Sequence, residues 1–341
     1  MFLRSPFKGL RFLKKRFILE KSMDLKKFWG KVEEAKRIGI AGHIRPDGDC
    51  IGSCLGMANY IRENFKASVD VYAEEFNQSF CFLKGSNDII FGYPDIKEPY
   101  DVFIVLDSGD LERIGAASKY YETAIFTACF DHHRTNMGLG YECLIDADAS
   151  ACAELIFSCM DYDRISKETA EALYLGIVHD TGVFKHSNTT GKTMEIAGRL
   201  LDKGVSAQYV MDKTFFEKTY IQNQILGRCL MESILLMDGK VIFSTVTKEV
   251  QELYGLKNSD MDGIIDNLRN TQGVEVAILL KEEKKREWKV SLRSKDIIDV
   301  STICKMYSGG GHIRAAGCSM HGSVYDVINS LTREIEKQFL N

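Results

Sequence analysis

The chain has 341 residues, of which 45% are hydrophobic and 27% charged, and its formal net charge is −4. This length suggests two domains, and the apolar content excludes a generally disordered chain or a minimal disulfide-stapled scaffold. Residues 1–22 contain seven Lys/Arg against one Glu, so residues 23–341 carry a charge of −10. A broad basic surface for long nucleic acid is therefore excluded, and any anionic ligand must be bound at a local site.

The first 22 residues mix Phe and Leu with Arg and Lys at short intervals. Their apolar runs are too short for the hydrophobic region of a signal peptide. We expect a disordered basic extension, or a segment upstream of a start at Met23. The alternative is a basic amphipathic helix that binds a membrane surface or an anionic partner. No stretch of the sequence reaches the roughly 18 to 20 apolar residues of a membrane span.

Short apolar runs alternate with helical patterns from Met23 to residue 191. Strands are predicted at Arg37–Ala41, Val69–Ala73, Asp101–Leu106 and Ala124–Phe130, with helices at Ile51–Asn64, near 151–162 and at 167–180. Strands separated by helices indicate an α/β fold with a doubly wound parallel sheet. In such sheets, functional residues gather beyond the carboxyl ends of the strands.

The pattern changes in the second half of the chain. Residues 192–235 have helical periodicity and are predicted to form a helical linker. Beyond them, strands are predicted at Val241–Val246, Val274–Leu280 and Trp288–Arg293, and the last two flank a charged hairpin turn over Lys281–Glu287. We predict a first domain over residues 23–191 and a second, smaller α+β domain over residues 236–341.

Ten cysteines are scattered along the chain without a CxxC pair or a regular spacing, and most lie in apolar stretches. This distribution is typical of buried thiols in a reducing cytoplasm. We do not expect a zinc site built from these residues.

Aspartates and histidines follow the predicted strands. They are His43, Asp47 and Asp49 after the first strand, Asp107 after the third, Asp131, His132 and His133 after the fourth, and Asp180 in a helix. Singly, each has an ordinary explanation as a helix cap or a core residue. Together, carboxylates at neighbouring strand ends would repel one another unless cations lay among them. An Asp and His set without Cys suits Mn²⁺ or Mg²⁺, and two ions roughly 3.5 to 4 Å apart promote displacement at phosphorus.

In order and context, His43-x3-Asp47-x-Asp49, Asp107, Asp131-His132-His133 and Asp180-Thr181-Gly182 resemble the motifs of the DHH phosphoesterases. The segment from Gly309 to Gly317 resembles the glycine-rich signature of their DHHA1 domain. The resemblance covers about residues 30–335. In size it is similar to the NrnA type, nanoRNases that hydrolyse short oligonucleotides and dephosphorylate 3′-phosphoadenosine 5′-phosphate (pAp). It implies a DHH catalytic domain over residues 23–191 and a substrate-binding DHHA1 domain over residues 236–341.

The resemblance also implies two Mn²⁺ ions, with Mg²⁺ or Co²⁺ as alternatives. The implied ligands are His43, Asp47 and Asp107 for one ion, and Asp49, Asp107, His132 and Asp180 for the other. Asp107 would then bridge the two ions, and a bridging hydroxide would attack phosphorus.

Four residues near the histidine pair have implied roles in catalysis. His133 would orient a ligand or protonate the leaving oxygen, which requires a group that titrates near neutral pH. Asp131 would hold an imidazole by a hydrogen bond, or only cap the following turn. Arg134 and Asn136 would contact the scissile phosphate, or be solvated loop residues.

The implied substrate-binding residues lie in the second domain, in two segments. They are Arg293, Ser294, Gly309, Gly310, Gly311, His312 and Arg314. Successive glycines let backbone N–H groups approach a phosphate, and an Arg can bind it with a bidentate fork. As plain sequence, the same glycines also suit a flexible loop.

We therefore predict a cytoplasmic, manganese-dependent phosphoesterase that acts on short oligonucleotides and pAp. The first alternative is a phosphodiesterase of cyclic di-AMP or of its linear product pApA. A RecJ-like single-strand exonuclease is less favoured, because that type carries additional domains and needs a basic track for long chains. A non-catalytic nucleotide sensor is also less favoured, because it should have lost Asp or His positions that this chain keeps. The sequence leaves a homodimer, the cleavage polarity and the choice of RNA or DNA open.

Overall fold

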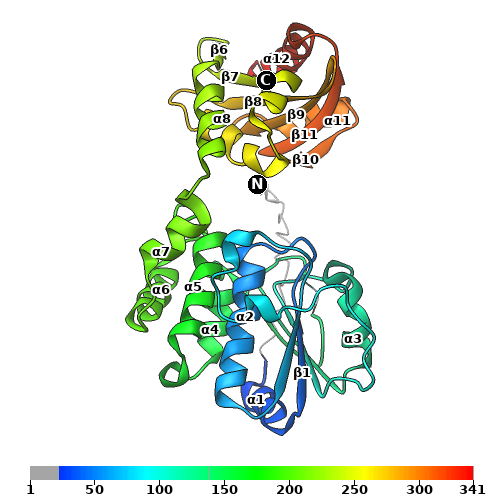
Figure 1. Cartoon of the computed structure of the whole chain (residues 1–341), viewed down its shortest axis with the longest axis vertical. Coiled ribbons are helices and arrows are strands. Elements are labelled where there is room, and N and C mark those ends of the chain that lie inside the picture. Colours follow the sequence, from blue (N-terminus) through cyan, green and yellow to red (C-terminus); the bar gives the residue numbers. More distant parts are fainter. Residues whose placement is uncertain (1–22, 137, 341) are drawn as a thin grey trace, which may run out of the picture. The chain divides into compact units, whose positions relative to one another are not determined.

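The structure is a computed structural model that describes residues 23–136 and 138–340. The segment 1–22, for which a disordered basic extension or an amphipathic helix is expected, lies outside these residues. The chain divides into unit 1, which ends at Glu217, and unit 2, which begins at Lys218 (Figure 1). The division falls inside the stretch 192–235, so the helices predicted for a linker are shared between the two units.

Unit 1 contains a five-stranded sheet in which every pairing is parallel. Its strands are β1 (Arg37–Ala41), β2 (Ser68–Tyr72), β3 (Val102–Leu106), β4 (Phe126–Asp131) and β5 (Glu142–Ile145). The strand order is β2-β1-β3-β4-β5. The order reverses at the neighbouring pair β1 and β3, and in such sheets the carboxyl ends of that pair open onto the ligand-binding crevice. The four predicted strands are present, and β5 was not predicted.

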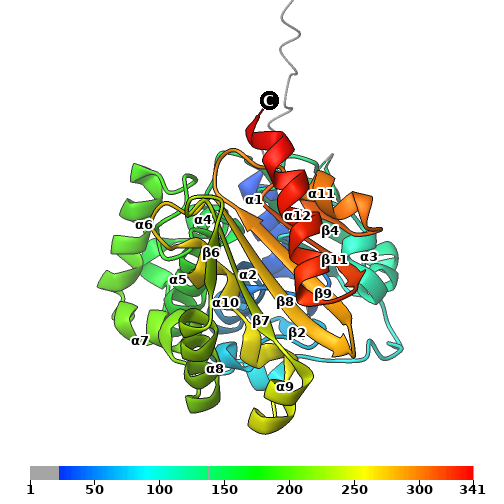
Figure 2. The ribbon, with the colours of Figure 1, turned by 90° about the horizontal axis from the view of Figure 1, so that it is seen from above.

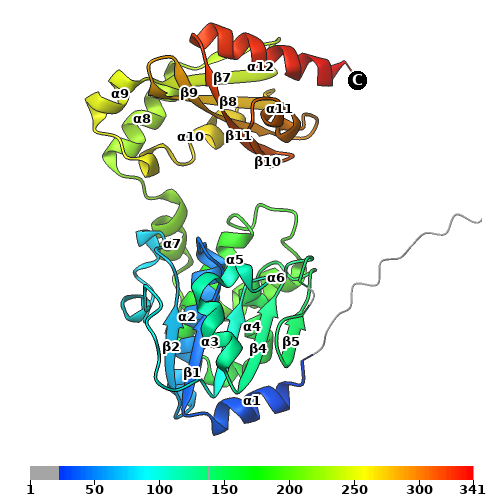
Figure 3. The same cartoon turned by 90° about the vertical axis from the view of Figure 1, so that its right-hand side faces the viewer.

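Helices cover both faces of this sheet, which confirms the doubly wound fold. They are α1 (Leu25–Glu34), α2 (Gly48–Asn64), α3 (Ser118–Thr123), α4 (Cys152–Cys159), α5 (Lys167–Asp180), α6 (Gly191–Asp202) and α7 (Ala207–Met211). Figure 1 shows α2, α4 and α5 on one side of β1 and α3 on the other, in agreement with two separate apolar cores. The unpredicted helix α1 lies beneath the strands (Figure 3).

Unit 2 is a mixed six-stranded sheet with helices on both faces, as expected for a smaller α+β domain. Its elements are α8 (Tyr220–Met231), β6 (Ile234–Leu236), β7 (Val241–Val246), α9 (Lys248–Tyr254), α10 (Ile264–Arg269), β8 (Val276–Lys284), β9 (Glu287–Ser294), α11 (Val300–Met306), β10 (Gly310–His312), β11 (Ala315–His321) and α12 (Val324–Phe339). The strand order is β10-β11-β9-β8-β7-β6. One face packs against α11 and α12, and Figure 2 shows α12 lying along the strands. The opposite face packs against α8, α9 and α10.

Two local expectations for unit 2 are corrected by the pairing of its strands. The predicted turn over Lys281–Glu287 is shorter, because β8 continues to Lys284 and pairs with β9 through a bulge. The glycine-rich segment is not a free loop, since Gly310 to His312 form β10 and pair with β11. No helix among the described residues is long and apolar enough to cross a membrane.

Cysteines are mostly packed inside the two units. None of the ten forms a disulfide within the described parts of the chain, and all except Cys81 are buried. The expected burial of the thiols is therefore correct for nine of them.

Candidate metal centre

Asp107 lies at the middle of the candidate site, directly after β3. Its backbone has φ +54°, a left-handed conformation that is strained for a residue other than glycine. Its carboxylate is 2% exposed, and Oδ2 lies 3.4 Å from His43 Nε2 while Oδ1 lies 3.4 Å from His132 Nε2. Oδ1 accepts no hydrogen bond from any residue that the structure describes. A buried carboxylate oxygen without a donor is costly, and a divalent cation would satisfy it.

Two imidazoles are oriented so that their Nε2 atoms face the carboxylates. His43 Nδ1 lies 2.9 Å from the carbonyl oxygen of Ile44, and His132 Nδ1 lies 3.3 Å from that of Ala149. These acceptors place a proton on Nδ1 and leave Nε2 as the ligand atom, an arrangement common among metal-binding histidines. His132 Nε2 lies 3.2 Å from Asp180 Oδ2, at the end of α5.

Asp49 is held at the same point by the beginning of α4. Its buried carboxylate accepts the backbone N–H of Cys152 at 2.6 Å and that of Ala153 at 3.0 Å. A Cβ on Gly176 would lie 2.6 Å from Asp49 Oδ1, so a glycine at this position of α5 lets α2 and α5 approach closely enough. The oxygen Oδ2 lies 3.8 Å from His132 Nε2.

The charges of the site show how crowded the carboxylates are. Burial raises the pKa of Asp49 well above its usual value, and the neighbouring charges of Asp107 and Asp180 add to the rise. Burial also raises the pKa of Asp180 to about 6, against the effect of His132. Burial disfavours protonation of His43, but hydrogen bonds with Asp107 and Asp47 outweigh it and raise the pKa of His43 to about 11. Without a metal, protons on imidazoles therefore balance the carboxylates, and a divalent cation would replace those protons.

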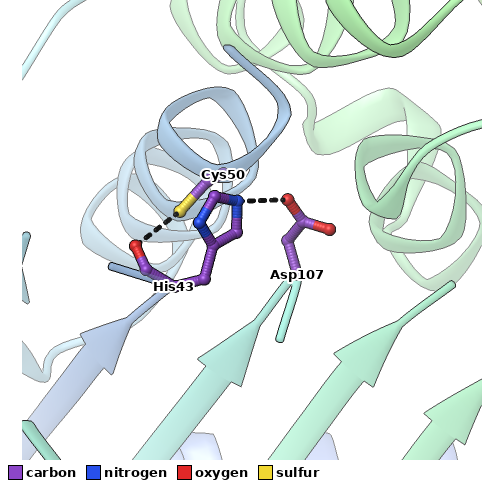
Figure 4. Close-up of side chains that lie close together, drawn as sticks. All are labelled: His43, Cys50 and Asp107. Carbon is purple, nitrogen blue, oxygen red and sulfur yellow. Dashed lines mark hydrogen bonds and ion pairs between the residues drawn. The ribbon is translucent and has the colours of Figure 1, made fainter. Parts of the chain in front are cut away.

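Three groups of ligand atoms converge here, each with its atoms within 4.8 Å of one another. They are Asp49 with His132 and Asp180, Asp107 with His132 and His133, and His43 with Cys50 and Asp107. Figure 4 shows the third group, where His43 Nε2 faces Asp107 and the Cys50 thiol lies beside His43. The donor chemistry of these groups fits divalent cations.

Five of the six predicted ligands belong to these groups, and Asp47 does not. Asp47 Oδ1 caps α2 by accepting the backbone N–H of Asp49 at 3.0 Å and that of Cys50 at 3.1 Å. It lies 3.8 Å from His43 Nε2. Cys50 is the unexpected member, because the sequence pattern contained only Asp and His. The role of Asp47 as a ligand stays a prediction.

His133 lies in a chain of hydrogen bonds at the rim of the centre. Its Nδ1 is 2.7 Å from Asp131 Oδ1, and Arg113 donates to its Nε2 over 3.4 Å. The hydrogen bond with Asp131 raises the pKa of His133, although partial burial opposes this. The sequence interpretation missed Arg113, since a single Arg six residues after Asp107 gives no distinguishing signal.

The other two predicted contacts of this rim differ from each other. Asn136 is buried and donates to Asp131 Oδ2 at 2.7 Å and to the carbonyl oxygen of Ser108 at 3.1 Å. Its amide is thus occupied in supporting Asp131. The Arg134 side chain is 74% exposed, with an ion pair of 3.8 Å to Asp148.

Some predicted substrate-binding side chains of unit 2 already make hydrogen bonds within the unit, and others are left open to a ligand. The Ser294 hydroxyl is buried and donates to the carbonyl oxygen of Ile298 at 2.6 Å. Arg314 donates to the same oxygen at 2.9 Å and to the carbonyl oxygen of Asp296. By contrast, Arg293 donates to the carbonyl oxygen of the adjacent Leu292 and lies 3.8 Å from Asp266. Its side chain is therefore less constrained than that of Arg314.

The three glycines also differ in their surroundings. A Cβ on Gly309 would lie 2.2 Å from the carbonyl oxygen of Gly317, and one on Gly311 would lie 2.4 Å from that of Ala315. No described atom lies within 4 Å of a Cβ on Gly310. Gly310, Gly311 and His312 are exposed. Gly309 and Gly311 are thus required by the pairing of β10 with β11, whereas Gly310 is open to a ligand.

A doubly wound domain with a carboxylate and imidazole centre at its strand ends, followed by a mixed α+β domain, is the arrangement expected of a metal-dependent phosphoesterase. The model of the family described as "DHH family, N-terminal domain" matches residues 37–177, and that of the "DHHA1 domain" matches residues 238–341. Together the two matches span well over half of the chain. The chain belongs to the DHH family and is a phosphoesterase, which is a hydrolase.

Relatives with similar sequences carry a more specific name. The bifunctional oligoribonuclease and PAP phosphatase NrnA of Bacillus subtilis is 25% identical over 86% of this chain and 92% of its own length. The protein of the same name from Thermus thermophilus is 28% identical over 84% of each chain. Among solved structures, an exopolyphosphatase-related protein from Bacteroides fragilis has a TM-score of 0.79 at 25% identity, covering 93% of this chain and 96% of its own.

Proposed function

We propose that the chain hydrolyses short oligonucleotides and pAp with two bound Mn²⁺ ions. The observation that carries this proposal is the convergence of Asp49, Asp107, Asp180 and two imidazoles around the buried Oδ1 of Asp107, which no described donor satisfies. The names of the Bacillus and Thermus relatives, which this chain covers over most of their length, support the substrate class. Mg²⁺ and Co²⁺ remain alternatives to Mn²⁺.

The ligand residues would divide into two positions joined by Asp107. Asp49, His132 and Asp180 would hold one cation, and His43 would hold the other, with Asp47 as its further ligand. When bound, the two cations would activate water and neutralise charge on the phosphate oxygens. Two backbone N–H groups donate to the carboxylate of Asp49, and backbone carbonyl oxygens contact Nδ1 of His43 and His132. These contacts keep the ligand atoms in place before substrate binds.

His133 is the proposed proton donor for the leaving oxygen. Asp131 binds its Nδ1, so the proton would be delivered from Nε2 once the Arg113 guanidinium, 3.4 Å away, turns from this nitrogen to the phosphate. Asn136 holds the other oxygen of Asp131 and thereby fixes the imidazole. Asp131 and Asn136 would act as positioning residues, while Arg113, which lies beside His133, would add a positive charge for the phosphate.

Unit 2 is proposed to bind the anionic end of the substrate. Arg293, Gly310 and His312 are the predicted positions that remain open to a ligand. A guanidinium fork and exposed backbone N–H groups bind phosphate without a broad basic surface, which agrees with the −10 charge of residues 23–341.

The cytoplasm is the proposed location. Nine cysteines are packed in apolar cores, and buried thiols are common in proteins of reducing compartments.

A substrate panel with the full chain and Mn²⁺ tests the proposal. We expect kcat/KM for pAp and for RNA of about two to five nucleotides to exceed that for long RNA and for cyclic di-AMP by at least about tenfold. Asp107→Asn protein is the inactive control. Faster hydrolysis of cyclic di-AMP would assign the alternative phosphodiesterase activity, and no hydrolysis of any member with any divalent cation would refute the proposed function.

A further inference from the structure

Residues 149–153, which end in the first turn of α4, form an orienting segment beside the metal centre. The first carbonyl oxygen of this segment, that of Ala149, lies 3.3 Å from His132 Nδ1. Its last two backbone N–H groups donate to the Asp49 carboxylate at 2.6 and 3.0 Å. The orienting segment therefore sets the direction of one imidazole and one carboxylate among the proposed metal ligands.

The same segment is connected to a third proposed ligand through Asn188. The Asn188 side-chain amide donates to the carbonyl oxygen of Ser150 at 3.0 Å and to that of Asp180 at 3.2 Å. Because Asp180 ends α5, this bridge connects the end of that helix to the orienting segment. Asp49, His132 and Asp180 together make up one of the ligand groups. Each member of that group is thus bonded to the orienting segment, directly or through Asn188.

Glu154 connects the orienting segment to α6. It is 1% exposed, and its Oε2 accepts the hydroxyl of Ser150 at 2.7 Å and the backbone N–H of Ser150 at 3.3 Å. The same oxygen accepts the hydroxyl of Thr193 at 3.0 Å, and Oε1 lies 3.2 Å from Lys192 Nζ. Burial makes these contacts specific, because a buried carboxylate must have its partners within the protein.

An acidic residue in the first turn of a helix commonly stabilises only the helix itself, by accepting free backbone N–H groups. Glu154 also binds the side chain of Ser150, and Ser150 lies between the carbonyl that contacts His132 and the N–H groups that contact Asp49. A small shift of this segment would therefore move ligand atoms, and metal sites tolerate such shifts poorly.

We propose that Glu154 is a positioning residue of the metal centre. By binding Ser150 it fixes the orienting segment, and the segment in turn holds Asp49, His132 and Asp180 in the geometry that one cation needs. Glu154 belongs to none of the ligand groups that the described residues form, so it acts through the segment and not as a ligand. This inference rests on the proposed metal-dependent function and adds a residue to it.

Two substitutions of Glu154 separate its hydrogen bonds from its charge. The three hydrogen bonds share Oε2, whereas the ion pair with Lys192 uses Oε1. Glu154→Gln keeps an acceptor oxygen for the hydrogen bonds and loses only the ion pair. The Lys192 side chain is 53% exposed, so water can replace its partner. Glu154→Ala removes the acceptor and leaves the orienting segment without this support.

Binding of Mn²⁺ to the full chain, freed of metal with a chelator, tests the proposal by electron paramagnetic resonance of the free ion. In Glu154→Ala, the affinity of one of the two positions should fall at least about tenfold, and in Glu154→Gln less than about threefold. Glu142→Ala is the matched control, because Glu142 is another buried glutamate of unit 1 but binds Lys27 of α1. It should keep the wild-type affinity.

Circular dichroism shows whether each variant folds. If Glu154→Ala does not fold, Ser150→Ala decides, since it removes only the hydroxyl that donates to Glu154 and should lower Mn²⁺ affinity about threefold or more. Wild-type affinity in the variant that decides overturns the proposal. An equal loss of affinity in Glu154→Ala and Glu142→Ala also overturns it, because the loss would then follow from stability alone.

Hydrolysis of pAp by the wild type with Mn²⁺ is measured separately. Its absence beside Mn²⁺ binding that depends on Glu154 refutes the proposed function and leaves this inference standing. A wild-type chain that binds no divalent cation refutes both.

Discussion

The metal centre of unit 1 and the glycine-rich segment of unit 2 are built in opposite ways. In unit 1, Asp49 and Asp107 are 0% and 2% exposed, and backbone N–H groups or carbonyls fix the atoms around them. In unit 2, Gly310 and His312 are exposed, and Arg293 makes only local contacts. The first site is therefore organised before any ligand arrives, whereas the second must be ordered by its ligand. Substitutions should accordingly abolish chemistry in unit 1 and weaken binding in unit 2.

The largest effect is expected for Asp107→Asn, which keeps the shape of the side chain but removes the charge shared by both metal positions. Loss of several kcal/mol of charge stabilisation corresponds to a decrease in kcat of at least about a thousandfold. Metal content by mass spectrometry should fall in parallel. Asp148→Asn serves as the control, because the Asp148 side chain is 89% exposed and outside the ligand groups. A fully active Asp107→Asn enzyme would contradict the assignment of the centre.

The comparison of two arginines in unit 2 gives the next largest effect. Arg293→Ala should raise KM for pAp about tenfold to a hundredfold with a smaller change in kcat, because a charge-assisted hydrogen bond to phosphate contributes about 1.5–3 kcal/mol. Arg314→Ala should instead lower the stability of unit 2, since Arg314 is bonded to the carbonyls of Ile298 and Asp296. Steady-state kinetics and thermal unfolding of both variants separate these outcomes. The reverse pattern would show that Arg314 is the phosphate ligand.

A smaller effect distinguishes two neighbouring glycines. Gly309→Ala should destabilise unit 2 by about 1–3 kcal/mol, because the added methyl group meets the carbonyl oxygen of Gly317. Gly310→Ala should be tolerated within about 0.5 kcal/mol, because its Cβ meets open space, although a bound phosphate would be held less closely. Trp288 is buried in unit 2 and reports its unfolding by fluorescence once Trp29 of unit 1 is replaced by Phe. Equal destabilisation by both substitutions would argue against the pairing of β10 with β11.

The sequence could predict that the side chains of the metal centre converge, because most of them follow apolar runs that can only be buried strands. Asp107 and His132 need no knowledge of distant contacts to be placed at the strand ends. The approach of Cys50 to His43 and Asp107 could not be predicted in this way. It depends on the cap that Asp47 forms at the beginning of α2 and on the space that Gly42 leaves for the thiol.

The glycine-rich segment of unit 2 was harder to predict, because two of its glycines are needed for close contact with the neighbouring strand β11. The sequence favoured three equivalent glycines that approach phosphate, but contacts with Gly317 and Ala315 distinguish Gly309 and Gly311 from Gly310. These contacts depend on the register of β10 and β11, which is not encoded in a local pattern. The strand β5 was missed for the same reason, since four residues acquire strand structure through pairing with β4.

The smallest effect is expected for Glu142, which lies outside both the metal centre and the glycine-rich segment. Its substitution should change the stability of unit 1 but not its catalytic activity. Glu142 on β5 binds Lys27 Nζ of α1 at 2.6 Å and accepts the backbone N–H of Asp24 at 3.0 Å. The hydrogen bond with Lys27 lowers the pKa of Glu142, against partial burial, and the N–H of Asp24 lowers it further. Because the folded chain holds the carboxylate more strongly than the unfolded chain, this contribution to stability is present above the unfolded pKa.

The same contribution is lost as the pH falls through the lower pKa of the folded state. Glu142→Gln should therefore melt slightly below the wild type at neutral pH, and the difference should shrink toward zero in acid. The effect is small because the Lys27 side chain is half exposed, which leaves the pair screened by solvent. Hydrolysis of pAp at neutral pH should be unchanged, since Glu142 lies in none of the ligand groups. A difference in melting temperature that grows on acidification would show that the carboxylate does not stabilise the junction of α1 and β5.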